Sequence, residues 1–315
     1  PPSYRESEIR VLTDRSIRYK NFYGDVFNDL IEPSSLSESG LFLAVYGGLS
    51  KRAYPDVDYF GDVLPNQKKF MSWKSTSRRV DREQEDYLQF FLYATGISSI
   101  RLKADVTFTD DSTTSTPILK RLDGVGRGDL ILVPAGPIHS GINSIDASKI
   151  VKSYVLTLTD QSSNAISEPI SYELISHKPP RTRYFMFLNS VGAYEIFRAT
   201  GVFEESFVSD KEEIQKFLGH DYDALDGEFE AYNMSSRKQF SGSTGFLLDA
   251  EEARVLSDLF LSPRVYALEG AKRVPIVVSG RETRIRVDKE YQYYVRFGYS
   301  EGYVERRFTP TSINN

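Results

Sequence analysis

Alternation of apolar and polar residues, the pattern of a half-buried β-strand, recurs along the first half of the chain. Residues 100–108 follow it almost strictly, and the polar run 110–116 predicts a turn before a strand returning from Pro117. Residues 151–158 alternate in the same way, and we expect them to pair with residues 166–174 across a turn at 160–164. Further strands are predicted at residues 9–12, 16–19, 41–46, 86–93 and 129–133, with a loop at 33–40.

Short strands separated by such turns are typical of an antiparallel β-sandwich. We therefore predict a sandwich of the immunoglobulin-like or jelly-roll type over residues 1–178, with residues 1–40 poorly patterned. His177-Lys178-Pro179-Pro180 is the best linker, since two prolines cannot continue a ladder. A second domain over residues 182–315 would follow, and 315 residues suit two domains.

The second half contains the only helical patterns. Residues 209–218 fit a helix because Ser209 and Glu212 form a capping box and Gly219 follows the apolar face. Residues 249–260 carry an apolar stripe that ends before Pro263. Strands are predicted at residues 264–268, 273–278, 283–287 and 291–299. The fold class is thus mainly β: a sandwich, then an α+β domain with an antiparallel sheet and two short helices.

Composition excludes several kinds of function. The chain has no cysteine, which removes thiolate catalysis, disulfides and cysteine-bound metals. Its net charge of −5 argues against a non-specific nucleic-acid binder, which needs a basic face. The chain contains no apolar run of about 18 residues, so the sequence predicts no membrane-spanning helix. The chain opens on Pro1-Pro2 without Met, so we interpret it as a fragment of a longer protein.

No catalytic residue set is apparent. His139, His177 and His220 lie far apart and outside any metal-ligand spacing. The glycine-rich run 123–129 lacks the helix that a phosphate loop requires, and we interpret it as a turn between strands. The acidic run 221–227 resembles a calcium loop, but Tyr232 holds the position of its last ligand.

Two surface features remain open. Trp73 lies near the basic residues Lys68, Lys69, Lys74, Arg78 and Arg79, a cluster that suits an acidic partner, a glycan or a solvated strand face. The tyrosines of residues 291–294 suit sugar stacking or sheet packing. The sequence therefore predicts no catalytic, cofactor-binding or metal-binding residue, and no cofactor.

The most distinctive stretch is residues 183–201, RYFMFLNSVGAYEIFRATG, where two strands flank an Asn-Ser-x-Gly turn. Asn189 suits the turn, either by bonding its own backbone through its side chain or by tolerating a left-handed conformation. Ser190 has no base or oxyanion motif beside it. We interpret the stretch as the opening hairpin of the second domain.

This stretch resembles a family of uncharacterised phage and prophage proteins of Bacteroidetes, tail-like or other virion structural components. The matching positions are Phe187, residues 189–192, Glu195 and Thr200-Gly201, with Ala193 where the family has a second glycine. Residues 248–266 and 274–278 are also similar, as are Thr109-Asp110-Asp111 in a hairpin and Ile166-Ser167-Glu168 in a late strand, so the resemblance spans roughly residues 85–300. It implies a structural or binding role and supplies no catalytic residue.

The sequence thus favours a non-enzymatic assembly component of a phage, prophage or tail-like particle. It would act through contacts with other particle subunits, as a homo-oligomer, in a particle assembled in the bacterial cytoplasm. The alternative is a carbohydrate-binding or adhesin module on a bacterial or virion surface. A glycan-active hydrolase is a third hypothesis, for which the chain has neither a nucleophile elbow nor a metal motif.

Overall fold

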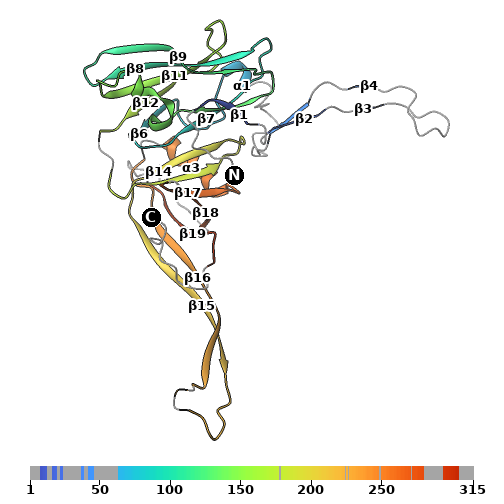
Figure 1. The fold of residues 1–315 in the computed structure, drawn as a ribbon, viewed down its shortest axis with the longest axis vertical. Helices are drawn as coiled ribbons and strands as arrows, with labels where there is room; N and C mark the ends of the chain where they lie inside the picture. Colours follow the sequence, from blue (N-terminus) through green and yellow to red (C-terminus); the bar gives the residue numbers. More distant parts are fainter. Residues whose placement is uncertain are drawn as a thin grey trace, which may run out of the picture. The chain divides into compact units, whose positions relative to one another are not determined.

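The structure is a computed structural model that describes residues 8–12, 16–19, 22–23, 37–38, 42–45, 63–176, 179–223, 225, 227–247, 250–270, 272–279 and 294–304. The chain divides into two compact units (Figure 1). Unit 1 comprises Pro1–Lys178 together with Leu188–Ile196, and unit 2 comprises Pro179–Phe187 and Phe197–Asn315. The tip of the hairpin at 183–201 therefore clusters with unit 1, and the bases of its strands cluster with unit 2.

Unit 1 contains a five-stranded sheet in the order β6-β12-β11-β8-β9. Its strands are β6 (Ser77–Val80), β8 (Ser99–Phe108), β9 (Thr113–Asp123), β11 (Val151–Thr159) and β12 (Ile170–Leu174). β11 and β12 form the hairpin that alternation predicts, with Tyr154 opposite Tyr172. β6 departs from the expected pattern because it pairs with β12 in parallel. A parallel neighbour need not be adjacent in sequence, so local patterning does not show it.

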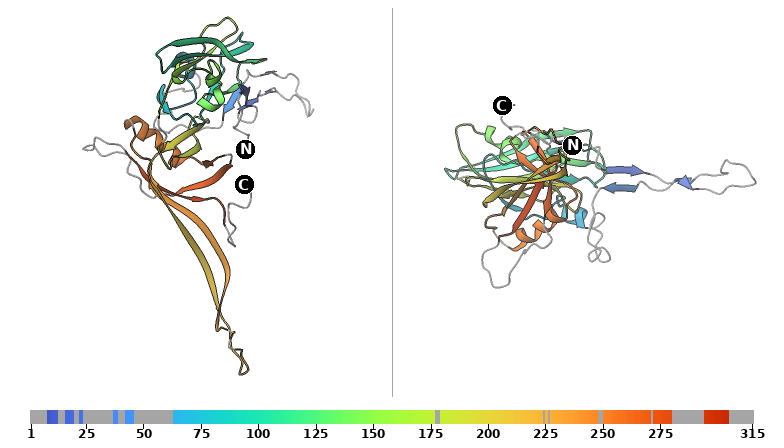
Figure 2. Two further views of the ribbon diagram at one scale, coloured as in Figure 1. Left: turned by 60° about the vertical axis from the view of Figure 1, so that its left-hand side comes forward. Right: turned by 90° about the horizontal axis from the view of Figure 1, so that it is seen from below.

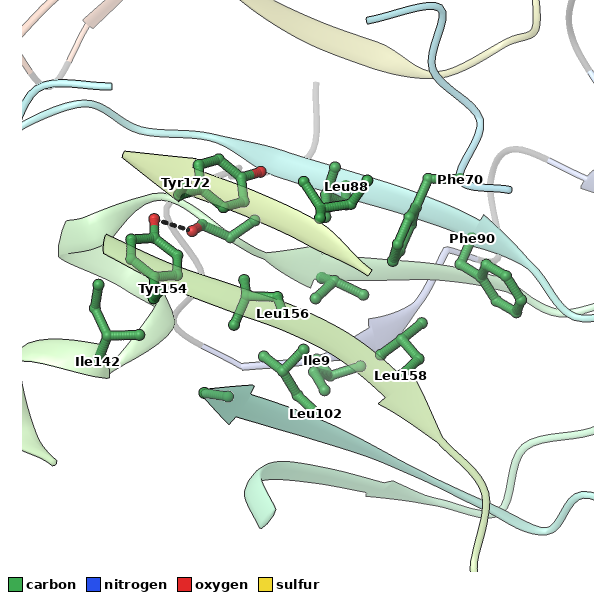
Figure 3. Close-up of a cluster of buried hydrophobic side chains, with 14 of the residues drawn as sticks. Ile9, Phe70, Leu88, Phe90, Leu102, Ile142, Tyr154, Leu156, Leu158 and Tyr172 are labelled. Atoms are coloured by element: carbon green, nitrogen blue, oxygen red, sulfur yellow. Dashed lines mark hydrogen bonds between the residues drawn. The ribbon is translucent and has the colours of Figure 1, made fainter. Parts of the chain in front are cut away.

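A second sheet of three strands lies in the order β1-β10-β7, built from β1 (Arg10–Val11), β10 (Leu130–Pro134) and β7 (Tyr87–Phe91). Leu88 and Ile131 from this sheet share one apolar cluster with Leu102 and Leu156 from the five-stranded sheet. The two sheets thus enclose a common core, as in a sandwich. Figure 3 shows this core, in which the rings of Tyr154 and Tyr172 stack with centroids 4.9 Å apart.

Smaller elements complete unit 1. α1 (Leu64–Gln67) and α2 (Pro137–Ser140) are single turns that the sequence pattern did not predict. A 3-10 turn, η2, follows at Ile142–Ser144. Two short ribbons pair β2 (Ser16–Tyr19) with β5 (Phe42–Val45), and β3 (Phe22–Tyr23) with β4 (Ser37–Glu38). The linker residues His177 and Lys178 lie outside the described residues.

The third large sheet has seven strands in the order β14-β13-β17-β18-β19-β16-β15. Its strands are β13 (Arg183–Leu188), β14 (Tyr194–Ala199), β15 (Phe203–Gln215), β16 (Phe229–Ser243), β17 (Val265–Glu269), β18 (Lys272–Ser279) and β19 (Arg296–Glu301). The ladders from β13 through β17, β18, β19 and β16 to β15 are antiparallel. The strands predicted at 264–268 and 273–278 are confirmed, whereas residues 283–287 lie outside the described part.

One helix, α3 (Ala250–Leu261), covers one face of this sheet. Its Leu256 and Leu259 share a buried cluster with Phe185, Val265 and Phe297 of the sheet. The helix predicted at 249–260 is therefore confirmed. The mainly β fold class predicted from the sequence is also confirmed.

The helix predicted at 209–218 is wrong. These residues belong largely to β15, which pairs with β16 along almost its whole length. Ser209 lies opposite Ser236 in the ladder instead of capping a helix. The glutamates and lysines of this segment are good helix formers, but helix propensity is a weak preference that pairing with another strand overrides.

Candidate functional site

His139 and His220, the two histidines that the structure describes, lie in separate elements. His139 lies in α2, stacked on Tyr87 with ring centroids 5.8 Å apart, and its Nε2 atom is 3.7 Å from the Glu85 carboxylate. His220 lies in the loop between β15 and β16, and His177 is outside the described residues. Among the residues that the structure describes, no group of three or more His, Asp or Glu side chains could hold a metal ion.

The glycine-rich run 123–129 connects β9 to β10, as the sequence predicted for a turn between strands. Its amides are used within the protein. Gly124 N donates to Ser98 O, Gly128 N donates to Leu92 O, and Gly126 N donates to the Asp129 carboxylate. A phosphate loop needs such amides directed at its ligand, so this turn is not built to hold one.

Most of the basic residues near Trp73 are engaged by other groups of unit 1. Arg78 is buried and its guanidinium donates to the Asp86 carboxylate at 2.9 Å. Lys74 Nζ donates to Ile196 O, and exposed Arg79 pairs with Glu173. The Trp73 ring stays 42% exposed, but its Nε1 donates to Ser190 Oγ at 2.8 Å.

The Asn-Ser-x-Gly turn is held by a buried amide. Asn189 Oδ1 accepts the Ala193 N–H at 2.8 Å, which confirms the predicted bond from the side chain to its own turn. Asn189 Nδ2 donates to Met71 O and to Glu195 Oε1, both at 3.0 Å. Gly192 adopts a φ of 87°, which favours glycine there. The turn residues and residues 71–73 thus form one polar network within unit 1, which gives them a structural role.

The hairpin of β15 and β16, residues 203–243, has no comparable structural role among the described residues. We call this hairpin the arm. Figure 2 shows it extending as a long two-stranded ribbon beyond the other strands of the seven-stranded sheet. β19 pairs with β16 only at residues 239–243. From residue 207 to residue 238, no described strand outside the arm pairs with it.

The arm carries a dense set of exposed apolar side chains. Of the 20 large hydrophobic residues that are exposed in the described part of the chain, nine fall between residues 207 and 234. Phe217 is 97% exposed and Leu225 is 92% exposed, both in the loop at the tip. The remaining seven are Phe207, Val208, Ile214, Tyr222, Phe229, Tyr232 and Met234.

These side chains lie on both faces of the arm. Phe207 and Val208 are consecutive residues of β15, so they project to opposite sides. A bulge between the pairs Asp210–Ser235 and Glu212–Tyr232 shifts the register, and Asn233 adopts a φ of 48° there. Exposed apolar side chains therefore occur on both faces of the arm, whereas a conventional sheet has one face covered by the core.

The base of the arm is firmly attached within unit 2. Phe203 of β15 packs edge-on against Phe297, and Phe240 of β16 stacks on Tyr299 with centroids 4.7 Å apart. The Arg183 guanidinium lies over both arm rings, 5.0 Å from Phe203 and 4.8 Å from Phe240. A rigid base holds a projecting element in a fixed direction with respect to the sheet that carries it.

Glycines allow the strands to approach at this base. A Cβ atom on Gly201 would lie 2.3 Å from Ser243 O, and one on Gly242 would lie 2.4 Å from Val202 O. Gly201 is the last residue of the stretch 183–201, so its Thr-Gly ending is explained by close backbone contact at the root of the arm.

The acidic run 221–227 lies at the tip of the arm. Leu225 N donates to Asp223 Oδ1 at 3.1 Å, which is a local turn bond. Ala224 and Asp226 are outside the described residues. The arm could not be recognised from the sequence, because residues 209–218 favour a helix and no strand was predicted over residues 229–243.

Comparison of the chain with protein-family models finds no match, and comparisons with curated proteins and with solved structures find none either. Within the described residues, no helix has the length and apolar character needed to cross a membrane.

Proposed function

We propose that this protein is a non-enzymatic structural or assembly component that acts through protein–protein contacts. The observation that carries the proposal is the arm, with nine large apolar side chains exposed on a ribbon of two strands. An isolated two-stranded hairpin is only marginally stable in water, so a partner that covers the arm would stabilise it. Exposed apolar surface of this density is characteristic of interaction sites.

The resemblance of residues 183–201 to virion structural proteins supports a phage or tail-like particle as the assembly in which the protein acts. On this proposal, the protein belongs to a phage, prophage or tail-like particle assembled in the bacterial cytoplasm. Its partners are other particle subunits, including copies of itself.

The test is to shorten the arm. Ser206 lies opposite Gln239 in the ladder, so an Asn-Gly turn can replace residues 207–238 and leave the pairing with β19 intact. The intact protein should form defined oligomers or capture particle components in pull-downs, and the shortened protein should do neither. Light scattering and negative-stain imaging measure the first, and circular dichroism checks that the shortened protein is folded.

A control substitution outside the arm tests whether making any exposed apolar residue polar weakens association. Leu261 is 82% exposed at the end of α3, outside the arm, so Leu261→Ser should leave association unchanged while Phe217→Ser and Leu225→Ser together weaken it. A strictly monomeric protein that captures no particle component would refute the proposal.

One observation favours glycan binding as a second candidate function. The Trp73 ring is 42% exposed and is fixed by its Nε1 bond to Ser190, as a sugar-stacking platform would be. A glycan array should then give binding that Trp73→Ala abolishes. An array without binding counts against this second candidate.

A further inference from the structure

The charge of the chain is unevenly divided between the arm and the rest. Residues 203–243 contain ten acidic and four basic residues, a net charge of −6. The other 274 residues, which we call the body, contain 34 acidic and 35 basic residues. The arm thus accounts for the whole negative excess of the protein. Contact between two arms would bring like charges together, whereas contact between an arm and a body would not.

The body offers a sheet surface of complementary character. α3 covers the face of the seven-stranded sheet that carries Ile276, Phe297 and Tyr299. Alternation places Arg273, Pro275 and Val277 of β18 on the opposite face, with Arg296 of β19. Val277 is 59% exposed and Arg296 is also exposed. We call these four residues the acceptor face.

The acceptor face is basic and apolar. Among the described residues of β18 and β19, the only acidic one is Glu301. Glu301 lies opposite Ile276 in the ladder and therefore on the α3 side of the sheet. An acidic, aromatic arm complements a surface of this kind in both charge and polarity.

The surface of the arm is large enough for a specific interface. A whole aromatic side chain buries about 150–250 Å², so the nine exposed side chains together present on the order of 1,000 Å². A standard protein–protein interface buries about 800 Å² on each partner. Because these side chains are divided between the two faces of the arm, one face presents roughly half of this apolar area, and the polar surface of the arm supplies the rest of its side of the interface.

We propose that the arm of one copy of this chain docks on the acceptor face of a second copy. The proposal rests on the assembly function proposed above and names its partner. The contact joins two different surfaces, so it is head to tail, and repetition produces a ring or a filament according to the angle between copies.

Complementation between two defective chains tests this geometry. The arm-shortened chain keeps its acceptor face, and the variant V277D/R296E keeps its arm. Neither chain should self-associate, and the two mixed should form a 1:1 heterodimer that does not grow. Mass photometry measures these masses at a concentration just sufficient for the unmodified protein to associate, where the expected weakening of roughly tenfold or more leaves each variant alone monomeric.

The control is Ile150→Asp, because Ile150 is 58% exposed and nearly matches the exposure of Val277. This variant should associate like the unmodified protein. Melting curves of all variants distinguish lost association from lost folding.

Two outcomes overturn the inference. If V277D/R296E associates normally while the shortened chain does not, arms pair with arms, and added salt should strengthen the contact by screening repulsion. If the purified protein stays monomeric but captures other particle components, the partner is a different protein. In that second case the proposed function stands, whereas a protein that does neither overturns both.

Discussion

The Arg78 guanidinium and the Asp86 carboxylate form an ion pair at 2.9 Å in which both side chains are almost fully buried. Burial alone would lower the pKa of Arg78, but Tyr172, Asp86 and Glu195 outweigh it and hold the pKa above its usual value. The Tyr172 hydroxyl donates to the same Asp86 oxygen at 2.7 Å. Two strands of the five-stranded sheet are therefore linked to the segment that leads into β7.

Replacing Arg78 by Met should strongly destabilise the protein. The substitution leaves Asp86 buried without its cation, which costs about 3–5 kcal/mol in comparable sites. Urea unfolding followed by fluorescence measures the loss in the free energy of unfolding.

The neighbouring residue provides the control. Arg79 pairs with Glu173, but both side chains are at least half exposed. Arg79→Met should therefore change the free energy of unfolding by about 0–1 kcal/mol. Equal effects of the two substitutions would show that the buried pair has no special role.

Asn189→Ala should destabilise the turn at 189–192. The substitution removes the acceptor for the Ala193 N–H, and it removes the donor to Met71 O and to the Glu195 carboxylate. All three of these hydrogen bonds are buried. Buried groups left unsatisfied cost about 1–3 kcal/mol each, and we expect a total near the top of that range. Thermal and urea unfolding provide the measurement. Ser190→Ala, which removes the bond from the exposed Trp73 side chain, should cost much less, and a reversed order would contradict the network described above.

The sequence predicted the parts of the fold that depend on neighbouring residues. Residues 151–158 and 166–174 alternate and are joined by a polar turn, so their pairing as β11 and β12 followed from pattern alone. The Asn189 bond is equally local. The parallel pairing of β6 with β12 joins residues almost a hundred positions apart, and no local period reports it.

The arm was mispredicted for a related reason. Residues 209–218 contain good helix formers, and it is pairing with partners 14 to 27 positions away that places residues 209–215 in β15. Phe207 and Phe229 are exposed because no strand among the described residues pairs with this part of the arm, and a sequence pattern does not encode that. The concentration of ten acidic residues in residues 203–243 was the one available signal that this hairpin differs from a packed one.

Gly242→Ala should loosen the root of the arm. The added Cβ would lie 2.4 Å from Val202 O and 2.5 Å from the Phe203 ring, so backbone or ring must move. Such overpacking costs about 1–3 kcal/mol. Hydrogen exchange should become faster at residues 203–206 and 239–242. Gly219→Ala is the control, since nothing lies within 4 Å of its added Cβ, and faster exchange in both variants would contradict this explanation.

The Asp110 carboxyl group, in the turn after β8, should titrate at an unusually low pH. The Ser112 side chain donates to Asp110, and this bond, with Lys149 and the Ser112 N–H, lowers the pKa of Asp110 to about 2. Because the folded pKa lies below the ordinary 3.8, the stabilisation is present above pH 3.8 and is lost as the pH falls towards 2. NMR titration of the Asp110 carboxyl should show this midpoint. Ser112→Ala should raise the midpoint towards 3.8, whereas an unchanged midpoint would assign the shift to Lys149 and the backbone N–H of residue 112.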